Sequence, residues 1–331
     1  YATLMFDLSG VSEELLPYTG ILQSVLGIID TNNYGYGELF NEINVHTGGI
    51  GTSLELYPDV TKAKEKDFRA TFEIKGKALY PQMKILFAMM REILMESRLD
   101  DEKRLKEILA MLKSRLQMSF QSSGHTTSAL RALSYGSPLS KFKDDTDGIG
   151  FYEVVRGIED FEEKKAELIQ NLKQLSRQIF RVDNVMISYT SSEDGLTPIE
   201  AAFREIKDTL YPELDGEETP CVLHCRKRNE GFKTSSKVQY VARVGNFIDH
   251  GAQYHGALQI LKVILSYDYL WQNVRVKGGA YGCMSNFNRI GEGYLISYRD
   301  PNLKKTMEVY EGVVDYLKNF TVDERDMTKY I

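Results

Sequence analysis

The feature that most constrains the fold of this 331-residue chain is an internal repeat. A six-residue stretch that begins at Tyr18 returns, with the same Tyr, Gly, Leu and Gln, in the stretch that begins at Tyr254. A second pair of matching stretches follows, and their alignment needs a one-residue adjustment. The first copy has Leu39-Phe40, Ile43, Val45 and Gly48-Gly49. The second copy has Leu270-Trp271, Val274, Val276 and Gly278-Gly279. Internal similarity of this kind indicates one structural unit that occurs twice.

Each copy mixes strand-like and helix-like segments. Strict alternation of apolar and polar residues over 68–75, and again over 238–244 and 294–298, is typical of strands with one buried face. Apolar residues at intervals of three and four indicate helices, which we expect over 15–29, 83–95, 101–120, 126–134, 158–180, 252–270 and 302–320. We expect residues 38–57 and the region around Gly278-Gly279 to be extended. The pattern predicts an α+β fold of two homologous domains, each a mostly antiparallel mixed sheet with helices on one face.

We place the first domain at residues 1–192 and the second at residues 193–331. The connection between them is expected within 191–219, which is rich in Ser, Gly, Pro and acidic residues. The first copy ends with helices and a closing strand, 185–189, that have no counterpart in the second copy. We therefore expect the second domain to be incomplete at its C-terminus and the chain to be a piece of a longer protein.

Composition and the absence of common motifs exclude several functions. Lys and Arg number 41 against 47 Asp and Glu, a formal net charge of −6, which disfavours a nucleic-acid partner. No apolar run reaches the roughly 18–20 residues that span a bilayer, so we expect no membrane association. Three cysteines do not form a disulfide framework, which favours a reducing compartment. The sequence has no phosphate-binding glycine loop, no G-x-S-x-G and neither H-E-x-x-H nor H-x-x-E-H.

The Cys and His residues give little support for a metal site in this chain. Cys221, His224 and Cys225 lie close in sequence, but a closed zinc site needs four ligands and no second cluster follows. If 221–225 is a strand, both cysteines share one face and His224 points to the other. The remaining histidines have no partner at a suitable spacing: His46, His125, His250 and His255. We interpret His250 and His255 as ordinary polar residues, and for His125, near a helix start, both a capping or structural role and a catalytic role stay open.

The segment from Arg275 to Gly282 stands out as a candidate site. Arg275 and Tyr281 are six residues apart, so in a continuous strand they would lie about 20 Å from each other. They can act on one small group only if the chain bends at Gly278-Gly279, and two glycines allow such a bend. The alternative is a tight turn with a packed tyrosine and a surface arginine.

Four sequence words, which occur in this chain in the same order as in the family, resemble the pitrilysin/insulinase zinc peptidases and most closely their presequence-protease subfamily. They are Arg275-x-x-Gly278-Gly279-Ala280-Tyr281-Gly282, Ser297-Tyr298-Arg299-Asp300-Pro301-Asn302, Ser123-Gly124-His125 with Ala129-Leu130-Arg131, and Gly148-Ile149-Gly150-Phe151-Tyr152. The zinc motif of that family, H-x-x-E-H, belongs to its N-terminal half and is missing here. The resemblance therefore implies the C-terminal half of such an enzyme.

The resemblance also implies roles for particular residues. Tyr281 would be catalytic, donating its hydroxyl to the scissile carbonyl oxygen, while Arg275, Gly278 and Gly279 would bind substrate. The first copy has Asn44 near the position of Arg275 and Ile50 near that of Tyr281. The first domain would therefore be non-catalytic and form a wall of the substrate chamber.

The partners and the compartment follow from the same resemblance. Zinc would be bound by the N-terminal half and not by this chain, and the substrates would be short unfolded peptides in a closed chamber. A non-catalytic peptide-binding or scaffold subunit is the alternative function. Such proteins would be cytoplasmic in bacteria and mitochondrial or plastid in eukaryotes.

Overall fold

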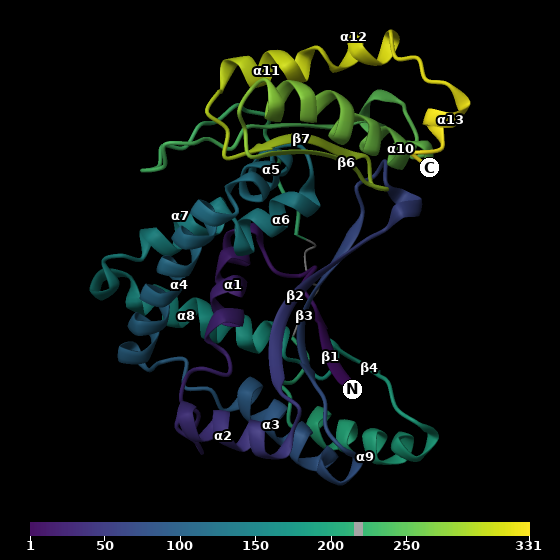
Figure 1. Cartoon of the computed structure of the whole chain (residues 1–331). Coiled ribbons are helices and arrows are strands. Elements are labelled where there is room, and N and C mark those ends of the chain that lie inside the picture. The colour runs from purple at the N-terminus through teal and green to yellow at the C-terminus, as the bar shows by residue number, and fades with distance from the viewer. Residues whose placement is uncertain (215–220) are drawn as a thin grey trace. The chain divides into compact units, whose positions relative to one another are not determined.

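The computed structural model describes residues 1–214 and 221–331, and the chain divides into two compact units (Figure 1). Each unit is built from three separate stretches. Unit 1 comprises Tyr1–Tyr57, Phe68–Arg115 and Asp145–Val222, and unit 2 comprises Pro58–Asp67, Leu116–Asp144 and Leu223–Ile331. These units group residues that contact one another in space. They do not test the division into two homologous domains after residue 192, which stays a prediction.

Unit 1 contains a four-stranded sheet in the order β2-β3-β1-β4. The strands are β1 (Ala2–Asp7), β2 (Ile50–Pro58), β3 (Phe68–Gly76) and β4 (Val185–Tyr189). β1 pairs antiparallel with both β3 and β4. The apolar face of the sheet carries Phe6 and Phe72, whose rings lie edge-on to that of Phe180 at 5.1 and 5.2 Å between centroids. Burial of these aromatic side chains drives the sheet against its helices.

The helices that pack on this sheet or on one another in unit 1 are α1 (Leu16–Val25), α2 (Tyr36–His46), α3 (Met83–Met95), α7 (Ile149–Gly157), α8 (Phe161–Ile179) and α9 (Leu196–Lys207). α1 packs against α8, and α3 packs against α9. α4 (Glu102–Ser122) and α6 (Pro138–Asp147) each cross a boundary between the two units. Among the described residues, no helix is both long enough and apolar enough to span a bilayer.

Unit 2 contains a three-stranded antiparallel sheet in the order β5-β7-β6. Its strands are β5 (Ala242–Asn246), β6 (Gly282–Phe287) and β7 (Glu292–Tyr298). Its helices are α5 (Gly124–Ser134), α10 (Ala257–Ile264), α11 (Lys304–Glu311), α12 (Val313–Lys318) and α13 (Glu324–Met327). α10 continues directly into η6 (Leu265–Val276), a helix with π-type hydrogen bonding.

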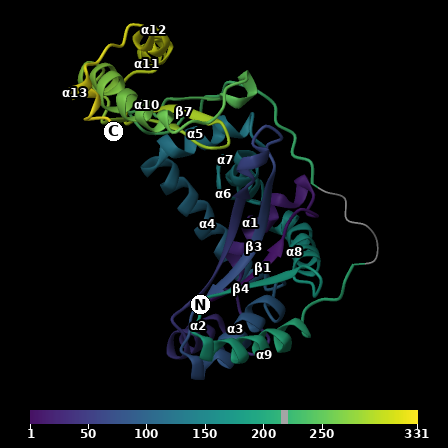
Figure 2. The same ribbon diagram turned by 90° about the vertical axis from the view of Figure 1, so that its right-hand side faces the viewer.

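Helices cover both faces of the unit 2 sheet, more than the one face expected from the sequence. One face packs on η6 through a core that includes Leu270, Val274 and Cys283. α5 contacts β5 and β7, and His125 at its start lies against Tyr298 of β7. Figures 1 and 2 both show α10 and α11 on the side of β6 and β7 away from α5.

The two sheets share a topology that matches the sequence repeat. The order β6-β7-β5 of unit 2 repeats the order β2-β3-β1 of unit 1. In each copy a helix, α2 or η6, ends at a glycine pair that leads into an edge strand. The second glycine of each pair is left-handed, with φ of 108° at Gly49 and 80° at Gly279.

The extended structure predicted over 38–46 and over the residues before Gly278 is wrong. Both stretches are helical, as α2 and as the last two turns of η6. The buried residues explain why, because Leu39 and Ile43, like Leu270 and Val274, are four residues apart and so face the core from one side of a helix.

Two other predictions need correction. Residues 221–225 form neither a strand nor a helix. The 191–219 connection contains α9, an amphipathic helix that the sequence analysis missed, while residues 215–220 of that connection lie outside the described residues.

Candidate functional site

The structure brings Arg275 and Tyr281 together. Arg275 lies in the last turn of η6, and its Nη1 donates a hydrogen bond of 2.5 Å to the carbonyl oxygen of Tyr281. The guanidinium carbon lies 4.1 Å from the centroid of the Trp271 ring and 5.7 Å from that of Tyr281. Cation–π contacts of this kind hold an arginine in place while leaving its other N–H donors free.

The bend between the two residues depends on both glycines, for different reasons. A side chain on Gly278 would place its Cβ 2.3 Å from the carbonyl oxygen of Val274. Gly279 has a φ of 80°, in the left-handed region that favours glycine. Its N–H donates to the carbonyl oxygen of Arg275 at 2.8 Å, which closes the end of the helix. The glycines therefore set the shape of the turn, and direct contact of either with substrate stays a prediction.

The segment 297–302 holds this turn from the other side. The side-chain amide of Asn302 donates to the carbonyl oxygen of Gly278 at 2.6 Å. Asp300 is fully buried, and its Oδ2 accepts from the hydroxyl of Thr306 at 2.7 Å. The backbone N–H of Tyr281 donates to the carbonyl oxygen of Tyr298 at 3.0 Å. Two of the four sequence words thus form one local structure around Tyr281.

The residue Tyr281 is 64% exposed, yet its ring packs on a row of aromatic side chains. Tyr281 lies edge-on to Tyr298 at 5.8 Å, and Tyr298 lies edge-on to His125 at 4.8 Å. Tyr240 closes the row, 5.7 Å from Tyr298 and 6.4 Å from His125. A Cβ on Gly124 would lie 2.2 Å from the Tyr240 ring, so the glycine allows this close approach.

His125 is more than the capping residue that the sequence analysis considered. Its Nδ1 is buried without a hydrogen-bond partner in the described structure, and burial lowers the pKa of the imidazole. An imidazole whose Nδ1 is buried without a partner resists protonation, because the charged form would lose hydration that no other group replaces.

His125 should therefore make stability depend on pH. The folded-state pKa lies below the unfolded value of about 6.5, so the unfolded chain binds the proton more readily, and stability falls as the pH drops below about 6.5. The loss is at most about 1.4 kcal/mol per pH unit. Urea unfolding at pH 7.5 and 5.5 should show a smaller loss in His125→Phe than in the wild type. An equal loss in both proteins would contradict this role.

The other sequence candidates do not form a metal site. Cys221, His224 and Cys225 lie in an irregular segment, and within the part of the chain that the structure describes no three His, Cys, Asp or Glu side chains are placed to hold a metal ion.

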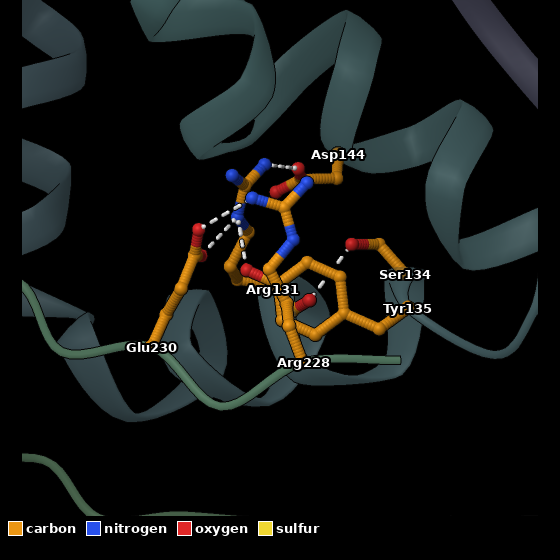
Figure 3. A network of polar contacts seen from close by, with 6 residues as sticks. All are labelled: Arg131, Ser134, Tyr135, Asp144, Arg228 and Glu230. Atoms are coloured by element: carbon orange, nitrogen blue, oxygen red, sulfur yellow. Dashed lines mark hydrogen bonds and ion pairs between the residues drawn. The ribbon is translucent and has the colours of Figure 1, made fainter. Parts of the chain in front are cut away.

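The basic residues 226–228 begin a segment that is tied to unit 2 by ion pairs. Arg228 pairs with Glu230 at 3.1 Å, and Glu230 accepts from Nε of Arg131 at 3.0 Å (Figure 3). Arg131 also donates to Asp144 at 2.7 Å. The third sequence word, which ends at Arg131, thus fixes residues 228–230 to α5 and α6, and its role in this structure is architectural.

The residues that sequence reasoning missed are Trp271, which supports Arg275, and Asn302, which holds the turn. Asn302 was part of a quoted sequence word but received no role. Its contact with Gly278 joins residues 24 positions apart. The one sequence signal for this contact was that the segment 297–302 directly follows a predicted strand.

Comparison with known proteins gives the family. The profile of a domain associated with subfamily C of the M16 peptidases matches residues 1–158, and the profile described as "PreP C-terminal domain" matches residues 229–331. Protein HypA of Clostridium perfringens is 39% identical over 100% of this chain and 34% of its own length. Presequence protease 1, chloroplastic/mitochondrial, of Arabidopsis thaliana is 27% identical over 100% of this chain and 31% of its own length.

Solved structures agree on the fold. A conserved protein from Enterococcus faecalis has a TM-score of 0.61 at 14% identity, covering 99% of this chain and 77% of its own. A peptidase M16 inactive domain from Pseudomonas fluorescens has a TM-score of 0.56 at 15% identity, covering 99% of this chain and 76% of its own. The chain spans about a third of the length of the curated relatives. Together with the two profile matches, these relatives show that the chain is similar to the C-terminal part of M16 presequence proteases.

Proposed function

We propose that this chain is the substrate-binding C-terminal half of a zinc-dependent oligopeptidase that degrades short unfolded peptides. The observation that carries the proposal is that one turn holds an exposed tyrosine and an arginine next to each other, with the guanidinium carbon 5.7 Å from the centroid of the tyrosine ring. Arg275 bonds the Tyr281 backbone, and Asn302 fixes the glycine pair between them. Relatives named presequence proteases support the peptide substrate and the peptidase activity.

Zinc is assigned to the half of the protein that this chain does not include. In the described part of the chain no three side chains of metal-ligating type come together, so its residues do not fit the metal. For this chain we propose a contribution through substrate binding and charge stabilisation.

Tyr281 would supply a hydrogen bond to the oxygen of the scissile carbonyl. Negative charge develops on that oxygen during hydrolysis, and a donor fixed in advance stabilises the charge by a few kcal/mol. The phenol is suited to this task because its ring is held by Tyr298 while the residue remains 64% exposed. Arg275 would position a backbone carbonyl of the same peptide through its remaining donors.

Replacement of Arg275 by Ala tests the proposal. Loss of a positioning guanidinium should raise KM and lower kcat for a short peptide, with kcat/KM reduced about tenfold to a hundredfold. The measurement is steady-state cleavage by the complete protein, with zinc content determined in parallel and expected to be unchanged.

Arg289→Ala is the matched control. Arg289 also lies over a tyrosine ring, 6.0 Å from the centroid of Tyr254, and should be dispensable. Equal effects of the two substitutions would reduce Arg275 to a structural residue. A complete protein that binds peptides but cleaves none would favour the scaffold function.

A further inference from the structure

We propose that Arg299 binds a carboxylate of the substrate peptide beside Tyr281. The inference rests on the proposed function and deepens it by naming a chemical group that the substrate must present. That group is either the C-terminal carboxylate or an acidic side chain. Three observations carry it: a strained backbone, an unused guanidinium and an unbalanced local charge.

The backbone of Arg299 is left-handed, with a φ of 48°. The described chain has one other non-glycine residue of this kind, Lys66, at 58°. The conformation costs an L-residue roughly 1–2 kcal/mol and persists only where the surroundings enforce it. The Lys66 side chain is in use inside unit 2, since its Nζ bonds the carbonyl oxygen of Gly136 and a carboxylate oxygen of Asp249, each at 2.9 Å.

Arg299 has no such internal use. Its guanidinium carbon lies 5.4 Å from the centroid of the Tyr298 ring, the side chain is exposed, and it forms no hydrogen bond or ion pair with any residue that the structure describes. The next residue, Asp300, is fully buried and exchanges two backbone hydrogen bonds of 2.8 Å with Gln239. Both flanks are therefore fixed, and the arginine is presented outward from a rigid turn.

The position of Arg299 links it to the candidate site. Its carbonyl oxygen lies 3.3 Å from the backbone nitrogen of Tyr281, within hydrogen-bonding reach, and Tyr281 and Arg299 are in contact with the same ring, that of Tyr298. A peptide held by Arg275 and Tyr281 would therefore pass close to Arg299.

The local charge is strongly positive although the whole chain has a net charge of −6. Five cations belong to the two segments that form the glycine turn or follow them directly in the sequence, and in the described part of the chain none of them forms an ion pair. This basic cluster comprises Arg275, Lys277, Arg299, Lys304 and Lys305. The carboxylate within the segment, Asp300, is buried and uses its oxygens for the N–H of Asn302 and the hydroxyl of Thr306.

A surface of this kind selects a carboxylate. A guanidinium matches the two oxygens of a carboxylate with parallel hydrogen bonds, and the surrounding cations raise the local concentration of anionic ligands. Every free peptide carries a carboxylate at its C-terminus, and acidic residues supply the same group internally. Arg299 would thereby discriminate among peptides by charge, while Tyr281 acts on whichever peptide bond is presented.

The test uses the complete protein, one parent peptide that contains acidic residues, and two altered forms of that peptide. One has a free C-terminus, one is C-terminally amidated, and one has its acidic residues changed to Asn or Gln. In the wild type we expect amidation or neutralisation to raise KM about tenfold, with kcat nearly unchanged. A higher KM for the amidated peptide would identify the C-terminal carboxylate as the bound group. A higher KM for the neutralised peptide would identify an acidic side chain. No rise with either peptide would overturn the proposal.

Arg299→Gln should abolish this discrimination, and Arg299→Lys should restore it in part. Arg299→Gly removes the guanidinium and relieves the backbone strain, so a loss of discrimination at unchanged thermal stability would result from the missing guanidinium. Arg289→Gln is the control and should keep the discrimination. Full discrimination in Arg299→Gln would overturn the proposal. If Tyr281→Phe still lowers kcat in that case, the proposed function stands and only the role of Arg299 falls.

Discussion

Tyr281→Phe should lower kcat for peptide cleavage by at least about tenfold. The substitution keeps the ring, which packs against Tyr298, and removes only the hydroxyl that would stabilise the developing oxyanion. Because this hydrogen bond strengthens in the transition state, KM should change little. Steady-state kinetics of the complete protein, with zinc content and thermal unfolding measured in parallel, check the prediction.

A matched control is available in the same unit. Tyr267 is 67% exposed on η6, and Tyr267→Phe removes a hydroxyl of similar exposure away from the glycine turn. This variant should retain wild-type turnover. If Tyr281→Phe turned over as fast as the Tyr267 control, Tyr281 would have no part in the chemistry.

Gly278→Ala should have the second large effect. The new methyl group would lie 2.3 Å from the carbonyl oxygen of Val274 and 3.0 Å from that of Asn273, and both contacts are backbone atoms that cannot move independently. The end of η6 must therefore unwind, which shifts Arg275 relative to Tyr281. We expect destabilisation of about 1–3 kcal/mol and a loss of kcat/KM of about a hundredfold, since a misplacement of about 1 Å has that effect.

Substitutions at two neighbouring glycines, Gly282 and Gly279, provide a comparison for Gly278→Ala. At Gly282 a Cβ would meet the Tyr298 side chain at 3.6 Å, an ordinary contact, so Gly282→Ala should be tolerated. At Gly279 space is available but φ is 80°, so Gly279→Ala should be destabilised by roughly 1 kcal/mol with a smaller loss of activity. Urea unfolding and kcat/KM measured across the three variants should follow this order. Equal activity in Gly278→Ala and Gly282→Ala would show that the turn geometry is unimportant.

Much of the fold follows from the sequence because the repeat and the strand alternation are local signals. The α+β class, the shared topology and strands such as β3 and β7 are confirmed. The prediction failed in the same place in both copies, where 38–46 and 271–276 are helical. The nearby glycines suggested interrupted extended structure. Burial of Leu39 with Ile43, and of Leu270 with Val274, favours a helix in both stretches, since tertiary packing overrides local propensity.

The candidate site could be predicted only in part. The sequence pointed to Arg275, Tyr281 and the need for a bend between them, all within seven residues. It could not reveal that Asn302 holds Gly278, or that His125 supports Tyr298 from a helix far earlier in the chain. Those contacts depend on the pairing of β6 with β7 and on the packing of α5 against β7, which no short sequence window encodes.

The way α4 runs along the chain has a practical consequence for dissecting this protein. The helix begins in unit 1 and ends in unit 2, with the boundary between residues 115 and 116 inside it. The chain also passes from one unit to the other between residues 57 and 58, 67 and 68, 144 and 145, and 222 and 223. No single truncation can therefore release either unit intact, and a shortened protein cut at residue 192 would lose the sheet of unit 2 while keeping α5, exposing apolar surface that invites aggregation.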